Sequence, residues 1–167
     1  IMGGMKSLQT IGKAFGISLG AYGLATFAKN AMNTADVLVN MADRIGINVE
    51  SLQALTFAAK QNDVSQEELA ASLKFLNKNI ADGSEKFATH GISLVDNAGK
   101  AKTLEQVLGD VADKLASTDK GYNRTQISMD LLGRSGDRLI TMLRGGSSEL
   151  ERLKDVAYAS GVVMDEA

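Results

Sequence analysis

No proline occurs anywhere in this 167-residue chain. At the usual frequency of about 5%, a protein of this length would contain roughly 8 prolines. A proline ring removes a backbone hydrogen-bond donor and clashes with the preceding helical turn. Its absence therefore leaves long stretches of the sequence free to form helices, and other signals must mark where those helices begin and end.

Apolar residues recur at helical spacing after residue 35, and the stripe that ends at Ile45 predicts an amphipathic helix. Gly46 followed by Ile47 is typical of a helix end, because glycine adopts the left-handed conformation without strain. The same pattern of a glycine followed by an apolar residue recurs at Gly91-Ile92 and Gly161-Val162. These three pairs predict three helix ends.

Helix starts have equally clear signals. Asn48 is a candidate N-cap, and capping boxes are expected at Ser65–Glu68, Thr103–Gln106 and Ser148–Glu151. The helix after Ser65 carries its apolar stripe on Leu69, Leu73, Leu76 and Ile80. Two shorter helices are expected between residues 121 and 146, with a split at residues 133–136.

One segment departs from this helical pattern. Residues 92–103 place a polar turn, Asp96-Asn97-Ala98-Gly99, between two short stretches, which predicts a small β-hairpin lying on the helices. The predicted fold class is therefore mainly α: a compact multi-helix body over residues 35–167 with one hairpin, preceded by a glycine-rich apolar helix over residues 1–34.

The N-terminal segment has its own chemistry. The first 35 residues carry three lysines and no acid, giving +3, whereas the rest carries 15 bases and 20 acids, giving −5. Gly12, Gly16, Gly20 and Gly23 fall on one face of the expected helix. Each interior glycine costs a helix about 1 kcal/mol. Close helix-helix contact of the GxxxG kind would recover this cost, so we expect self-association through these four glycines.

Composition removes many catalytic classes. The chain has no cysteine and one histidine, His90, so thiolate chemistry and histidine-built metal sites are excluded. We expect His90 to lie at a helix end rather than in an active site. Residues 133–136 match the GXXG pattern of nucleic-acid-binding KH loops, but a helix-helix turn is the preferred interpretation because the body is acidic. We expect Arg134 and Arg138 to form solvated ion pairs with Asp130 and Asp137. No enzyme activity, cofactor or metal is predicted.

The order of these motifs resembles the tail tape measure proteins of long-tailed bacteriophages and prophages. The motifs that carry the resemblance are, in order, the glycine-rich segment, Ala42-Asp43-Arg44-Ile45-Gly46, Asn48 to Leu55, Val64 to Leu69, the Gly-Ile-Ser hairpin, Thr103 to Leu108, Leu132 to Gly136, and Gly161 to Met164. Each motif is short, and together they cover nearly the whole chain.

The resemblance implies an internal segment of a structural virion protein, made in the host cytoplasm and located in the lumen of the tail tube. It further implies a role in setting tail length and in DNA ejection. The implied partners are other copies of the chain, the tail tube protein, tail tip or baseplate proteins and a tail assembly chaperone, with no sequence-specific nucleic-acid binding. Because capped helices and a hairpin fold compactly, we interpret the segment as a folded node within the tape rather than an extended ruler.

Two alternative functions remain open. Residues 1–30 could be a membrane-active or pore-forming segment that contacts the host membrane during ejection. The uncharged stretch of residues 14–28 is shorter than the roughly 20 residues that span a bilayer. The chain could also be a non-catalytic region of a tail-associated cell-wall hydrolase.

The glycine face predicts the effect of a double substitution. Replacing Gly16 and Gly20 with leucine should disrupt self-association, because the larger side chains prevent close helix contact. Light scattering would report the loss of oligomer mass, and circular dichroism should show an unchanged helical body. An unchanged oligomer mass would exclude this face as the interface.

Overall fold

The computed structural model describes residues 36–119 and 121–163. Within these residues the chain forms eight helices and no regular strand. Residues 36–45 are helical and are followed by α3 (Val49–Gln61), α4 (Gln66–Ala81), α5 (Glu85–Thr89), α6 (Leu104–Ser117), α7 (Tyr122–Leu132), α8 (Gly136–Leu143) and α9 (Gly146–Ala159). The predicted segment 1–34, with its glycine face, lies outside the described residues.

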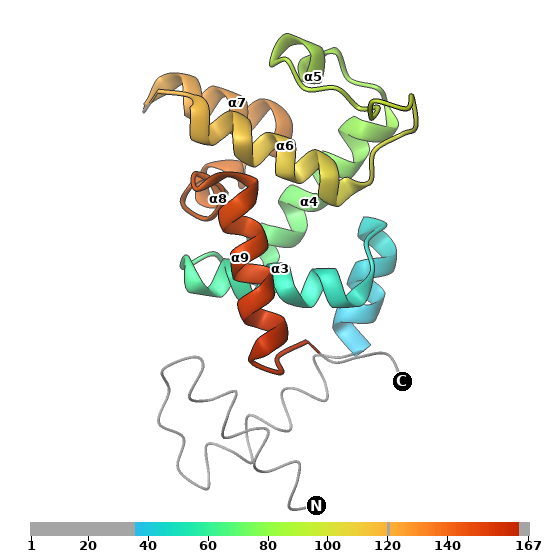
Figure 1. Ribbon diagram of the computed structural model, residues 1–167, viewed down its shortest axis with the longest axis vertical. Helices are drawn as coiled ribbons and strands as arrows, with labels where there is room; N and C mark the ends of the chain where they lie inside the picture. The colour runs from blue at the N-terminus through green and yellow to red at the C-terminus, as the bar shows by residue number, and fades with distance from the viewer. Residues whose placement is uncertain (1–35, 120, 164–167) are drawn as a thin grey trace, which may run out of the picture.

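Two groups of helix contacts dominate the long-range packing. α9 makes its most extensive contacts with α6 and α3, while α7 packs on α8 and α4 (Figure 1). α3 is the most enclosed, because every residue from Ser51 to Ala59 is buried between α4, α8 and α9. The apolar residues at helical spacing, Leu52, Leu55 and Ala59, account for only part of this burial.

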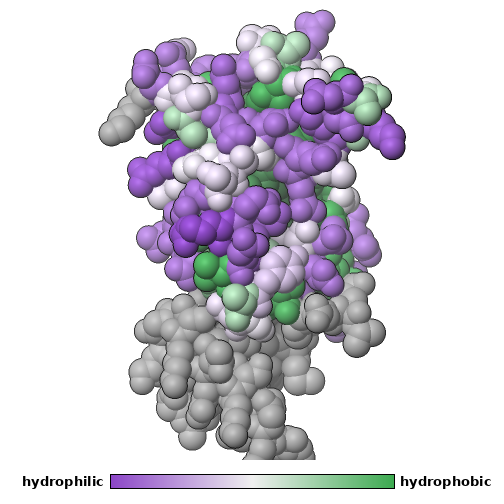
Figure 2. Space-filling model, viewed as in Figure 1, coloured by the Kyte–Doolittle hydropathy of each residue, from purple (hydrophilic) through white to green (hydrophobic). Residues whose placement is uncertain are grey.

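Leucine dominates the core. Most of the largest fully buried side chains are leucines, and the cluster they form includes residues from every described helix. Phe87 anchors the short α5 to this cluster. The surface facing the viewer in Figure 2 is mostly hydrophilic, with small hydrophobic patches. This division between core and surface follows the apolar stripes of the sequence.

The predicted helix ends are confirmed at all three glycine pairs. Gly46, Gly91 and Gly161 have φ values of +81°, +72° and +67°. In each case the residue after the glycine donates its backbone N–H to the carbonyl five residues earlier, as in Ile92 to Phe87 at 2.8 Å. Glycine is favoured here because other residues are strained at positive φ.

Helix starts agree with prediction at two of the three capping boxes. Ser65 with Glu68 and Thr103 with Gln106 both form the reciprocal hydrogen bonds. The box predicted at Ser148–Glu151 is wrong, because α9 begins at Gly146 and has no cap from its own flanking side chains.

Asp113 of α6 caps α9 instead. Its Oδ1 accepts from Ser147 N at 2.7 Å, and its Oδ2 accepts from the Ser147 hydroxyl at 2.9 Å. A carboxylate at this position satisfies an otherwise unpaired N–H group and complements the helix dipole. The contact joins residues 34 apart, so helical periodicity and local capping patterns could not predict it.

The predicted β-hairpin at residues 92–103 is also wrong. The turn forms, but in the described chain the pairing is limited to one isolated antiparallel bridge between Val95 and Ala101. Asp96 Oδ1 accepts from the backbone N–H groups of Ala98 and Lys100, which organises a compact loop. Val95 is 48% exposed, so little apolar burial favours extending the pairing, and two strands alone are marginal in water.

Leu73 tests the predicted core stripe of α4. Its side chain is fully buried, so Leu73→Ala should lower the free energy of unfolding by about 2–5 kcal/mol through lost burial and cavity formation. Urea denaturation would measure the change. Lys74→Ala is the matched control on the exposed side of the same helix, and we expect a change within about 0.5 kcal/mol. Equal effects of the two substitutions would contradict this assignment of the core.

Candidate functional site: a basic groove

The single histidine lies where α5 meets α7. His90 is the C-cap of α5, which agrees with the predicted place at a helix end. Its Nε2 lies 3.0 Å from Asp130 Oδ2, and Asp130 Oδ1 accepts a hydrogen bond from Gln126 at 2.9 Å. These contacts hold α5 against α7 and give His90 a structural role. The sequence contains no local signal for the pairing with Asp130, which is 40 residues away.

The turn at residues 133–136 is explained by close packing. It connects α7 to α8, as the sequence predicts. A Cβ added at Gly133, where φ is +80°, would lie 2.9 Å from the Phe75 ring. A Cβ added at Gly136 would lie 2.5 Å from the carbonyl oxygen of Ser128. Glycine is therefore required at both positions by conformation or by space, with no need for a bound nucleic acid.

The ion pairs predicted for Arg134 and Arg138 with Asp130 and Asp137 do not form: among the described residues, no ion pair involves Arg134 or Asp137. Arg138 pairs with Glu68 across 3.8 Å rather than with Asp130 or Asp137. Arg152 donates two hydrogen bonds to Glu149, at 2.6 and 2.8 Å. Hydrogen bonding from Arg152 lowers the pKa of Glu149.

Lys154 is a cation held inside the fold. Its side chain is 13% exposed, and its Nζ lies 3.0 Å from Glu151 and 3.3 Å from Glu105. Burial alone would lower the pKa of Lys154, but the hydrogen bonds and charges of the two carboxylates outweigh it and raise that pKa. Because Glu105 lies on α6, this cation links α9 to α6.

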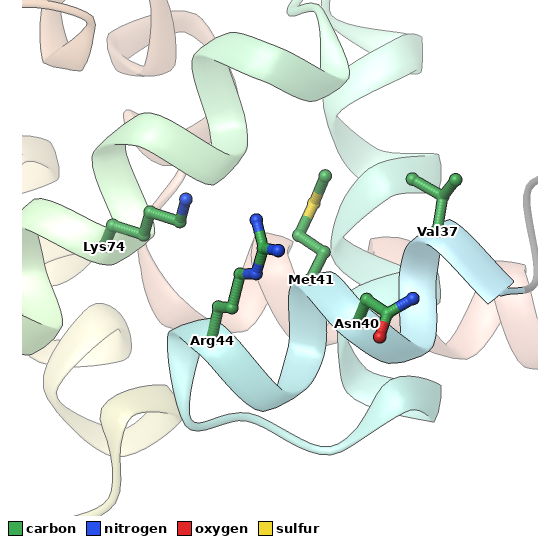
Figure 3. A pocket seen from close by; sticks show the side chains of 5 residues that line it. All are labelled: Val37, Asn40, Met41, Arg44 and Lys74. Carbon is green, nitrogen blue, oxygen red and sulfur yellow. The ribbon is translucent and has the colours of Figure 1, made fainter.

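A groove between helix 36–45 and α4 contains cations of a different kind. It is lined by Val37, Asn40, Met41 and Arg44 from the first helix and by Lys74 from α4. The first four lie on one helical face, at spacings of three and four residues. Figure 3 shows Arg44 and Lys74 extending toward one another from the two walls, with Met41 beside them. The groove has a volume of about 260 Å³.

The two groove cations differ from Lys154 in their surroundings. Among the described residues, no ion pair involves Arg44 or Lys74. Both residues are exposed, and two like charges that face one another repel. An anionic group placed between them would interact favourably with both charges. The arrangement is therefore suited to binding a carboxylate or another anion.

The sequence did not reveal this groove. It places Asn40 and Arg44 on the polar side of the first helix, but it gives no sign that Lys74 faces them. Only the packing of helix 36–45 against α4 brings the two cations together.

Over the described ranges, no group of three or more metal-ligating side chains is placed to hold a metal ion. In the same part of the chain, no helix combines the length and apolar character needed to cross a bilayer. The chain matches no family model, no curated protein and no solved structure.

Neutralising the buried Lys154 should change the free energy of unfolding more than neutralising the exposed Arg44. Lys154→Gln should lower the free energy of unfolding by about 1–3 kcal/mol, because Glu105 and Glu151 lose a buried partner. Arg44→Gln should change it by less than about 0.5 kcal/mol, because an exposed, unpaired charge contributes little. Urea unfolding of both variants would measure the difference. A large loss for Arg44→Gln would instead assign Arg44 to the structural framework.

Proposed function

We propose that this chain is a structural segment of a phage or prophage tail tape measure protein. The observation that carries the proposal is the order of short motifs along the sequence, which resembles that family from the glycine-rich segment to Gly161. The proposed location is the lumen of the tail tube. The proposed partners are other copies of the chain, the tube protein, tip or baseplate proteins and an assembly chaperone.

Several residues of the motifs that carry the resemblance lie at the ends of helices. Gly46 and Gly161 end helices, while Asn48, Ser65 and Thr103 cap them. Residues of this kind set where helices begin and end. The pattern that carries the resemblance is therefore a pattern of fold.

The compactness of the body supports a folded node within the tape. As one continuous helix, residues 36–163 would extend for about 190 Å at roughly 1.5 Å per residue. Packed as a single body of this size, the same residues occupy a diameter of about 40 Å. The contribution of this segment to tail length should therefore be close to the diameter of about 40 Å, not to the helical length of about 190 Å.

An in-frame deletion tests both the proposed role in setting tail length and the proposed folded node. In the phage that encodes the chain, deleting residues 36–163 should shorten the tail by no more than about 40 Å. Deleting an equally long helical stretch elsewhere in the same gene is the matched control, which should shorten it by about 190 Å. Tail lengths would be measured by negative-stain electron microscopy, and mass spectrometry would test whether the chain is present in purified virions.

Three outcomes would contradict parts of the proposal. Absence of the chain from virions would reject a virion role. Tails of unchanged length after every deletion would reject a length-setting role. A loss of about 190 Å for residues 36–163 would retain the tape function but reject the folded node.

A further inference from the structure

We propose that the basic groove between helix 36–45 and α4 binds an acidic, amphipathic helix of a partner protein. This inference rests on the groove itself and does not depend on the tape measure function. The groove has a basic end, formed by Arg44 and Lys74, and an apolar side, formed by Val37 and Met41. A partner of matching chemistry presents carboxylates and aliphatic side chains on one face.

The charges of the chain favour an anionic partner at this place. The body after residue 35 has a net charge of −5, yet Arg44 and Lys74 form no ion pair with any described residue. Two unpaired cations that face one another on an acidic body form a local positive site. The attraction acts at short range, because the body as a whole repels anions of every kind.

The apolar side favours a protein segment over a small anion. Val37 is 53% exposed, and Met41 lies partly buried against the core cluster. A small anion would leave the exposed apolar surface of Val37 uncovered. The groove volume of about 260 Å³ is also below the roughly 300–1,000 Å³ of pockets that enclose small molecules.

The geometry favours a helical occupant. The lining positions of helix 36–45 follow one helical face from Val37 to Arg44, a length of about 10 Å. α4 supplies the opposite wall through Lys74. A helix lying in this groove would place glutamates four residues apart beside the cations and leucines one turn away beside Val37 and Met41.

Binding of a designed probe to the full chain tests the proposal. The probe is a fluorescently labelled helical peptide of about 15 residues, with two glutamates four residues apart and two leucines on the same face. Fluorescence anisotropy would measure its Kd for the wild type and for the R44E/K74E variant. We expect Kd to rise at least about tenfold in the variant, because attraction becomes repulsion.

The K100E/R134E variant is a matched control. It makes the same change in net charge at two exposed residues outside the groove, so it should bind the probe with nearly the wild-type Kd. A peptide with lysines in place of the glutamates should bind R44E/K74E more tightly than it binds the wild type. Thermal unfolding would verify that both variants are folded.

The opposing outcomes are equally specific. Equal binding of the probe to R44E/K74E and K100E/R134E would reject the groove as the site. No saturable binding of the probe to the wild type would reject an acidic helical partner. Tighter binding of duplex DNA or phosphatidylglycerol vesicles than of the peptide, lost in R44E/K74E, would assign the groove to a different class of partner.

Discussion

The enclosure of α3 is the constraint on which the rest of the fold depends. Residues Ser51–Ala59 are buried on every side of the helix, although they include Ser51, Gln53 and Thr56. The Thr56 hydroxyl donates to the Leu52 carbonyl at 2.7 Å, so part of this polarity is satisfied within the helix itself. Small residues allow neighbouring helices to approach, and α4, α8 and α9 take their positions around α3.

Helix ends fix the arrangement around that central helix. Local caps set most boundaries, and their hydrogen bonds connect residues three to five apart. Other contacts tie distant segments together: Asp113 caps α9 from α6, Lys154 pairs with Glu105, and His90 pairs with Asp130. Each places a charged or polar group where it satisfies another, because an unpaired group at these partly buried positions would be costly.

The basic groove differs from those structural contacts. Lys154 has two carboxylate partners and lies almost inside the fold, whereas Arg44 and Lys74 are exposed and face one another in the groove (Figure 3). Pairs that stabilise a fold bring opposite charges together. A site for an external partner instead leaves charges unsatisfied until that partner arrives, which is why the groove rather than the buried pairs is the candidate interaction surface.

The sequence alone determined the helical class, the three glycine helix ends, two capping boxes and the turn at residues 133–136, because each depends on residues a few positions apart. The hairpin predicted at residues 92–103 was wrong, because the residues of a turn do not determine whether the flanking segments pair as strands. Tertiary structure decided the burial of α3 on all sides, the cap that Asp113 provides and the juxtaposition of Arg44 with Lys74. The physical reason is distance along the chain: these features join residues whose proximity arises only when the helices pack.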